Sequence, residues 1–398
     1  MGIKVLVISH MYPSSSHPVA GIFVHEQVKA LMEQGYEIRV VSAVPFAPFP
    51  LNRLRAKWHG YAQIPSHAVL DGVEVYYPRY ISFPSGILFE YAGALMHCGV
   101  RALIEELYPR FPFDIIHAHV ALPDGNAALR LKEKFKKPLV VTIHGRDFAH
   151  TLLKNKRCNR AVRDVLAGAG RVITVSDKLK KVARENVTQP SKVRTIHNGI
   201  TVPKLIEASR NKKTPAGGRT ILSVSNLIDL KGIDYNLRAV AKLVEKYPDL
   251  RYIVVGDGVE RKNLKHLAAD LKIEGRVIFK GQLPHDQVLE LMGEADIFSL
   301  PSWNEAFGVV YLEAMAAGTP IVACRGAGIE DVIEDRKTGM LVEPRDLADL
   351  TRAIDYLLSS PREAQSMGAL GRELVFDGLT WEHNARKTIT VYKEVLAE

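Results

Sequence analysis

The stretch DIFSLPSWNEAFGVVYLEAMAAGTPIVA, residues 296–323, decides the fold of this chain. The short apolar run DIFSL predicts a buried strand, the next loop is rich in Pro, Ser and Asn, and a helix is expected to start near Glu305. Gly318, Thr319 and Pro320 end that helix before a second buried strand, PIVA. This order of strand, helix and strand predicts a parallel β-sheet with a crossover helix.

The same alternation recurs along the whole chain. Strand-like runs in the first half are KVLVIS, IRVVSAV, FDIIHAH, PLVVTIH and RVITVS, and those in the second half are TILSVS, RYIVVG and RVIFKG before DIFSL and PIVA. A polar segment rich in Gly, Pro and Lys, 203–218, interrupts the pattern and predicts a linker. At 398 residues, the chain is also too long for one ordinary core.

The sequence therefore predicts an α/β fold with two doubly wound, Rossmann-like domains facing a cleft. We expect an N-terminal domain over residues 1–202 and a C-terminal domain over residues 203–377. The last segment, 378–398, is expected to form a helix that returns to the N-terminal domain. Loops that follow the strands should carry the chemistry, because ligands of open parallel sheets bind beyond the carboxyl ends of the strands.

Composition limits the class of protein. The hydrophobic content of 47% with 24% charged residues is typical of a globular protein, and no uncharged apolar stretch approaches the ~18 residues of a membrane span. The start of the chain has a strand pattern and not a secretory leader, so we expect a cytoplasmic protein. Residues 1–200 contain 27 Lys and Arg against 15 Asp and Glu, whereas the second half has a slight acidic surplus.

Two carboxylates in the deciding stretch, Glu305 and Glu313, suggest the reaction. Eight residues along a helix separate them by ~12 Å. A glycosidase pair must lie ~5–9.5 Å apart, so these two fit opposite ends of a longer ligand such as a nucleotide sugar. The backbone amides of 307–309 would then face its diphosphate at the helix N-terminus. The alternative remains that Glu305 is only a favourable N-terminal charge and that Glu313 is a surface residue.

Other loops that follow strands offer further candidates. In SNLIDLKG (225–232), Lys231 precedes a helix start and suits a diphosphate leaving group, although a solvated surface lysine is the alternative. The loop before Gly21 contains small residues that would let the backbone approach a phosphate, although a plain loop is the alternative. In FDIIHAH, His117 and His119 point to the same face of a strand, where either of them lines the cleft or packs in the core.

Together these residues resemble the retaining glycosyltransferases of family four, which have the two-domain GT-B architecture. The element EAFGVVYLE (305–313) is joined in order by TIHGRD (142–147), HNGI (197–200), VVGDG (254–258) and RGAGIEDVI (325–333). The resemblance covers nearly the whole chain. Within this family, the opening segment looks like bacterial enzymes of cell-surface polysaccharide synthesis, the teichuronic-acid type among them.

The resemblance implies a nucleotide-diphosphate sugar as the donor substrate, no cofactor, and a role for each matching residue. It also implies that the N-terminal domain is the acceptor-side domain and that the C-terminal domain binds the nucleotide sugar. His119, Glu305 and Lys231 are the expected catalytic residues: the cleft histidine, the carboxylate near the donor sugar and the diphosphate-binding lysine. The expected donor-binding residues are Gly21, Asn226, Lys231, Phe307, Gly308, Val309 and Glu313, the last as the ribose-binding carboxylate. One position departs from the family, because Asn226 replaces the usual arginine. This leaves the phosphate charge to Lys231 and the backbone amides, unless Arg325 or Arg146 compensates.

Other functions fit the sequence less well. No Asp-x-Asp follows a strand, which predicts transfer without a metal. In GDGVER (256–261), Arg261 stands where a dinucleotide motif needs its third glycine, which disfavours an oxidoreductase. A nucleotide-sugar epimerase of similar architecture is the closer alternative. A nucleic-acid-binding role would rest only on the pI of about 9.3, so we expect no such partner.

The segment VPFAPFPLNRLRAKWHGY (44–61) predicts a further partner. Aromatic and apolar residues alternate there with Arg53, Arg55 and Lys57, a mixture that suits the boundary between lipid headgroups and acyl chains. With the basic surplus of the first half, this pattern predicts peripheral attachment to an anionic membrane surface on its inner face, and an acceptor that is lipid-linked or otherwise membrane-proximal. A loop packed on its own domain is the alternative.

Overall fold

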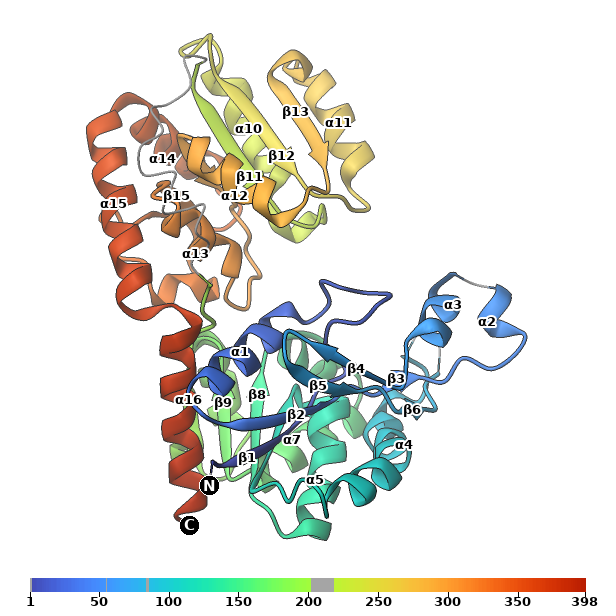
Figure 1. The fold of residues 1–398 in the computed structure, drawn as a ribbon. Helices are drawn as coiled ribbons and strands as arrows, with labels where there is room; N and C mark the ends of the chain where they lie inside the picture. Colours follow the sequence, from blue (N-terminus) through green and yellow to red (C-terminus); the bar gives the residue numbers. More distant parts are fainter. Residues whose placement is uncertain (1, 55, 84–85, 202–217) are drawn as a thin grey trace. The chain divides into compact units, whose positions relative to one another are not determined.

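The computed structural model describes residues 2–54, 56–83, 86–201 and 218–398, and the chain forms two compact units (Figure 1). The first unit contains Met1–Asn198 together with Trp381–Glu398, and the second contains Gly199–Thr380. Each unit is a largely parallel sheet covered by helices, so the predicted α/β class with two doubly wound, Rossmann-like domains is confirmed. The predicted linker, 203–218, lies outside the described residues except for Gly218.

The sheet of the first unit has the strand order β10-β9-β8-β7-β1-β2-β5-β4. Neighbouring strands pair in parallel except β4, which pairs with β5 in the antiparallel direction. A separate pair, β3 (Val44–Pro45) and β6 (Arg79–Tyr80), joins two loops of the same unit. The strands of the main sheet are β1 (Lys4–Ile8), β2 (Glu37–Val41), β4 (His67–Leu70), β5 (Val73–Tyr76), β7 (Ile115–His119), β8 (Leu139–Ile143), β9 (Arg171–Thr174) and β10 (Val193–Thr195).

Helices cover both faces of this sheet because its strands are apolar on both faces. Val5 and Val7 of β1 belong to the core that includes apolar residues of α1 (Ile22–Glu33) and α16 (Trp381–Leu396). Figure 1 shows α4 (Ala92–Leu107), α5 (Asn126–Phe135) and α7 (Lys156–Gly168) on the other side. The shorter helices of this unit are α2 (Leu51–Leu54), α3 (Ala56–Gln63), α6 (Leu152–Lys154) and α8 (Asp177–Glu185).

The last helix, α16, is integrated into the first unit by polar contacts as well as by its apolar face. The Tyr392 hydroxyl lies 2.6 Å from Nδ1 of the buried His117. The Gln27 amide on α1 donates a hydrogen bond of 2.6 Å to Asn384. Because these groups are buried, truncating the side chain of one partner would leave the other unsatisfied, at a cost of ~1–3 kcal/mol per group.

The second unit has a six-stranded parallel sheet in the order β13-β12-β11-β14-β15-β16. Its strands are β11 (Thr220–Val224), β12 (Arg251–Val255), β13 (Val277–Gly281), β14 (Ile297–Ser299), β15 (Ile321–Cys324) and β16 (Met340–Val342). Its helices are α10 (Ile233–Leu243), α11 (Arg261–Asp270), α12 (His285–Glu294), α13 (Val309–Ala316), α14 (Leu347–Ser359) and α15 (Pro361–Gly378). None of the helices in the described part of the chain is long and apolar enough to cross a membrane.

Candidate functional site

The loop between β14 and α13 differs from its prediction. Gly308, at the N-cap of α13, has φ 92° and ψ 73°, a left-handed conformation that cannot continue a helix. A Cβ atom there would lie 2.6 Å from the Tyr311 ring and 3.0 Å from Cγ of Glu305. The helix therefore begins at Val309, and the predicted start near Glu305 is wrong. Because Glu305 lies in the loop, a helical rise does not give its separation from Glu313.

The amides expected to bind the donor lie on both sides of this helix start. Val309 is the first residue of α13, whereas Phe307 and Gly308 precede it. The Phe307 side chain is buried and anchors the loop in the core. Amides in the first turn of a helix lack intrahelical acceptors and carry the positive end of the helix dipole. An anionic group would be stabilised at this helix N-terminus.

Two of the predicted catalytic residues of the second unit form an ion pair. The Lys231 ammonium, at the end of the loop that follows β11, donates to Oε2 of Glu305, and each side chain is only 18% exposed. Ser302 connects the same loops, because its hydroxyl donates to the carbonyl of Leu230 at 3.1 Å and lies 3.4 Å from Glu305 Oε2. The pair is therefore held at the carboxyl edge of the sheet, as the positions of both loops predicted.

Glu313, the predicted ribose-binding carboxylate, lies on α13 and faces the first residue of α12. Its Oε1 atom is 2.9 Å from Nε2 of His285. The Glu313 side chain is 19% exposed and that of His285 is 62% exposed. The Glu313 carboxylate thus contacts a histidine whose ring is accessible to solvent or to a ligand.

The arginine that would compensate for Asn226 is not found in Arg325. Asn226 itself is exposed in the loop after β11. The Arg325 guanidinium is bound to Asp335 at 2.5 Å and to Glu343 at 3.3 Å. Because two carboxylates already balance its charge, Arg325 is poorly suited to bind a phosphate as well. Arg146 belongs to the first unit.

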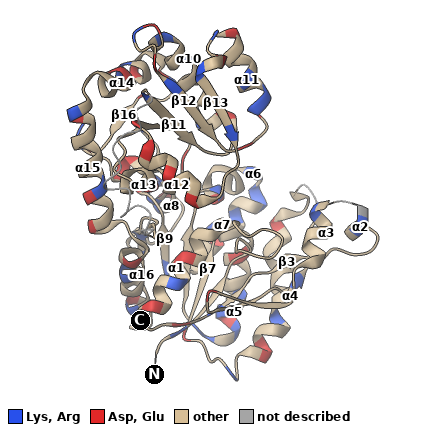
Figure 2. Cartoon of the chain, turned by 45° about the horizontal axis from the view of Figure 1, so that its top comes forward, with Lys and Arg blue, Asp and Glu red and all other residues tan. Residues whose placement is uncertain are grey.

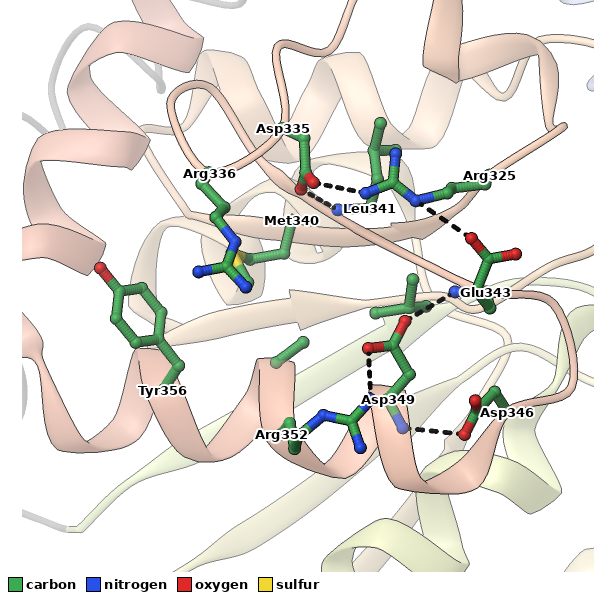
Figure 3. A pocket seen from close by; sticks show the side chains of 12 residues that line it. Arg325, Asp335, Arg336, Met340, Leu341, Glu343, Asp346, Asp349, Arg352 and Tyr356 are labelled. Atoms are coloured by element: carbon green, nitrogen blue, oxygen red, sulfur yellow. Dashed lines mark hydrogen bonds and ion pairs between the residues drawn. The ribbon is translucent and has the colours of Figure 1, made fainter.

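Arg325 lines a hollow of about 460 Å³ beside the edge strand β16 and helix α14 (Figure 3). The acidic side chains of this hollow are engaged locally. Asp335 accepts hydrogen bonds from Arg325 and from the amide of Leu341, and Asp349 accepts from the amide of Glu343 and pairs with Arg352. The hollow contains none of the predicted donor-binding residues.

In the first unit, Gly21 contacts the loop that follows β1, and its role near a phosphate stays a prediction. It is the N-cap of α1 and has φ 66°. A Cβ atom at Gly21 would lie 2.1 Å from the carbonyl oxygen of Met11, so the loop after β1 contacts the backbone of Gly21 directly. Only glycine combines this positive φ with so close an approach.

His117 and His119 face the same side of β7, as their spacing predicted, and their rings stack at 4.5 Å. Both are buried, and Nδ1 of His119 lies 3.0 Å from Nε2 of His144. Burial, with His144 nearby, lowers the pKa of His117 to about 3. Burial, with both neighbouring histidines, lowers the pKa of His119 well below its usual value. The two histidines are therefore neutral, and the catalytic role of His119 stays a prediction.

Sequence reasoning missed a polar cluster that lies beyond β1, β7 and β8. His10 is the second residue after β1, and its Nδ1 lies 2.7 Å from Oδ2 of the fully buried Asp124, which follows β7. Asp147, beyond β8, accepts a hydrogen bond of 2.5 Å from the amide of Ala121. The sequence did contain a signal for these residues, because all three follow strands at the carboxyl edge of the sheet. The sequence could not predict that His10 pairs with Asp124, because 114 residues separate them.

Comparisons with known proteins cover both units. A family model described as Glycosyltransferase Family 4 matches residues 20–202, and one described as Glycosyl transferases group 1 matches residues 206–374. A D-inositol 3-phosphate glycosyltransferase of Acidothermus cellulolyticus is 30% identical, over 72% of this chain and 68% of its own length. A Bacillus subtilis protein named as a glycosyltransferase of teichuronic acid biosynthesis is 28% identical, over 88% of each chain.

A solved structure extends the likeness to three dimensions. The Anabaena protein HepE, determined in complex with UDP and glucose, superposes with a TM-score of 0.70. The match covers 98% of this chain and 100% of HepE, at 18% sequence identity. At that identity the likeness shows a shared fold.

Proposed function

The chain belongs to the family-four glycosyltransferases of GT-B architecture, and we propose that it transfers a sugar from a nucleotide-diphosphate sugar to an acceptor hydroxyl with retention of anomeric configuration. It is a glycosyltransferase of polysaccharide or glycoconjugate synthesis; the proposal concerns the donor, the stereochemistry and the residues. The second unit would bind the donor and the first unit the acceptor. The transferred group would be a hexose or a hexose derivative.

The pairing of Lys231 with Glu305 carries the proposal for the donor. Neither group would bind a nonpolar ligand well. Together, however, the cation and the carboxylate match the diphosphate and the sugar hydroxyls, which are adjacent in a nucleotide sugar. Lys231 would neutralise the diphosphate, and Glu305 would accept hydrogen bonds from the hydroxyls of the sugar. The N-terminus of α13 adds positive potential beside Glu305. Stabilising the diphosphate as it leaves is the main rate effect expected of such a site.

Glu313 would bind the other end of the donor. A carboxylate can accept two hydrogen bonds from the ribose diol, and the exposed His285 ring next to it leaves room for a ligand. We propose that transfer needs no divalent metal, because Lys231 and the amides at the start of α13 supply the positive charge that a metal ion would otherwise supply. No cofactor is required by this scheme.

The first unit would contact the acceptor and an anionic membrane surface. Phe46 and Phe49, in the loop after β3, are 52% and 73% exposed. Because β3 pairs with β6, the exposed Ile81 and Phe83 after β6 follow the neighbouring strand. Lys and Arg on α2 and α3, blue in Figure 2, accompany these apolar side chains, and the Arg53 guanidinium lies over the Phe49 ring. Arg55, part of the same prediction, lies outside the described residues.

A screen of nucleotide sugars tests the donor proposal directly. A bound ligand raises the unfolding temperature by mass action, so the true donor should stabilise the chain in a concentration-dependent way. Mass spectrometry of reactions with and without acceptors should then detect a glycosylated product only when an acceptor is present. If no nucleotide sugar or nucleoside diphosphate stabilises the chain, the donor proposal is wrong. Conversion of the donor to an epimer without acceptor would also contradict it.

A further inference from the structure

The polar cluster of His10, Asp124 and Asp147 lies at the carboxyl edge of the first sheet. Its hydrogen-bond geometry is not required by the packing of the fold. Asp124 is completely buried, and both of its oxygens are occupied by one residue: Oδ1 accepts from the amide of His10 at 3.0 Å, and Oδ2 pairs with Nδ1 of His10 at 2.7 Å. The His10 side chain itself is 35% exposed. A buried carboxylate thus fixes an imidazole whose other edge reaches the surface.

This geometry selects the tautomer of His10. An ionised carboxylate only accepts hydrogen bonds, so the His10 proton must lie on Nδ1. When the ring is neutral, Nε2 keeps its lone pair. Within the described residues no group bonds to this Nε2 atom, which leaves a hydrogen-bond acceptor open to a ligand.

A second carboxylate next to this pair is incompletely satisfied. Asp147 is 2% exposed, and its Oδ2 atom is buried with no hydrogen-bond partner among the described residues. Burial raises the pKa of Asp147 to about 6, against the opposing effect of the Ala121 amide and other backbone donors. Leaving a buried carboxylate oxygen unpaired is costly, so the site is built for something other than stability.

The charged groups around His10 raise its pKa. Burial alone would lower the pKa of His10, but the charge of Asp124 and its hydrogen bond outweigh that effect. Asp147 also raises the pKa and Arg146 lowers it, with a net increase above 6.5. Of these three charged groups, Asp124, Asp147 and Arg146, two are negative. The site therefore disfavours an anionic ligand and favours an uncharged, hydroxyl-rich one.

We propose that Nε2 of His10 accepts a hydrogen bond from a hydroxyl group of a sugar or other polyol acceptor, and that Asp124 holds the ring in the tautomer that permits this. The inference rests on the proposed function and assigns the acceptor end of the same reaction. Its position agrees with the rule that ligands of open parallel sheets bind beyond the carboxyl ends of the strands. His10 is then an acceptor-binding residue and Asp124 a positioning residue.

Nitrogen-15 NMR of histidine side chains in the full chain tests both parts. The His10 signals are identified by their loss in His10→Gln. Above its pKa, the parent should show Nδ1 protonated and Nε2 bare, and Asp124→Asn should abolish that preference. D-glucose is the probe for a neutral polyol and inorganic phosphate the probe for an anion. Glucose should shift the His10 Nε2 signal saturably, and the exposed His266 on α11 serves as the internal control.

The outcomes separate the alternatives. A saturable glucose shift at His10, absent at His266 and weakened roughly tenfold in Asp124→Asn, supports the proposal. A proton on Nε2 of the neutral ring, a shift with phosphate alone, or no shift with either probe overturns it. If Asp124→Asn does not fold, the protonation of the His10 nitrogens and the glucose shift measured in the parent chain still decide between these outcomes. Nucleotide binding by the second unit is measured separately, so failure of the donor proposal remains distinguishable.

Discussion

The ammonium group of Lys231 and the carboxylate of Glu305 are 74 residues apart in the sequence and form an ion pair at the carboxyl edge of the second sheet. Both side chains are mostly buried, so neither charge is simply solvated. A donor that binds here must exchange partners with this pair: its phosphate with Lys231 and its sugar hydroxyls with Glu305. The two carboxylates of this unit, Glu305 and Glu313, should consequently respond differently to mutation.

Glu313→Ala should weaken the binding of a nucleoside diphosphate by roughly ten- to a hundredfold, because it removes charge-assisted hydrogen bonds worth ~1.5–3 kcal/mol. Glu305→Ala should leave that binding within a few-fold of the parent and instead lower turnover. Isothermal titration with UDP and other nucleoside diphosphates measures the first effect, and product formation the second. Glu363→Ala, an exposed position on α15, is the matched control. Unchanged nucleotide affinity in Glu313→Ala would refute the ribose assignment.

Transfer should continue in the presence of a chelator. Lys231 and the α13 N-terminus supply fixed positive charge, so removing divalent ions should change the rate by less than about twofold. The measurement compares initial rates in excess EDTA, in magnesium and in manganese. Activity that is lost in EDTA and restored by either metal would show that the site depends on an ion.

The buried carboxylate of Asp147 should destabilise the fold at neutral pH. Its pKa in the folded chain is about 6, above the ordinary value of 3.8, so unfolding releases a proton between these values. The cost is absent below the lower value and complete above the higher one. Asp147→Asn should therefore raise the free energy of unfolding by up to ~3 kcal/mol at pH 8 relative to the parent, and by much less near pH 4.

Chemical denaturation of parent and variant across this range checks the prediction for Asp147. Asp164→Asn, an exposed substitution on α7, controls for the loss of one negative charge. An equal effect of Asp147→Asn at both ends of the pH range would mean that the carboxylate does not titrate as described.

Attachment to vesicles should require anionic lipid. Each Lys or Arg near such a surface contributes ~1 kcal/mol, so changing Arg53, Arg55 and Lys57 together to Ser should reduce binding by roughly a hundredfold. Sedimentation with phosphatidylcholine vesicles, with and without phosphatidylglycerol, measures this at low and high salt. The control changes Lys178, Lys181 and Arg184 on α8, three exposed cations of the same unit. Equal loss in both variants, or equal binding to neutral vesicles, would exclude a specific surface at 44–61.

The sequence predicted the fold class because the buried strands have a recognisable sequence pattern. Runs such as KVLVIS and PLVVTIH are continuous and β-branched, as parallel strands covered on both faces must be, and they became β1 and β8. The three-residue strands β10 and β16 were not predicted, whereas the equally short β14 was, because it lies within the longer apolar run DIFSL. The helix start at 309 was missed because Glu305 looks like a good first-turn residue, and only the left-handed Gly308 excludes it.

For the candidate site, sequence reasoning named residues but not the neighbours that contact them in the fold. Lys231, Glu305 and Glu313 were named from their places after strands or on a helix. The partners His285 and Asp124 were not, because each contact joins residues that only the folded sheet brings together. Burial was the hardest property to predict: nothing in the alternation of His117 and His119 shows that both rings are enclosed.

The return of α16 to the first unit affects how this protein is made. Residues 1–198 leave the ribosome long before the helix that supplies Tyr392 to His117 and Asn384 to Gln27. Until the whole second unit has been synthesised, part of one face of the first sheet, beside α1, therefore lacks its covering helix. Early termination near residue 380 should therefore damage the distant N-terminal half more than the half that was just completed, and should make that half a substrate for chaperones and proteases.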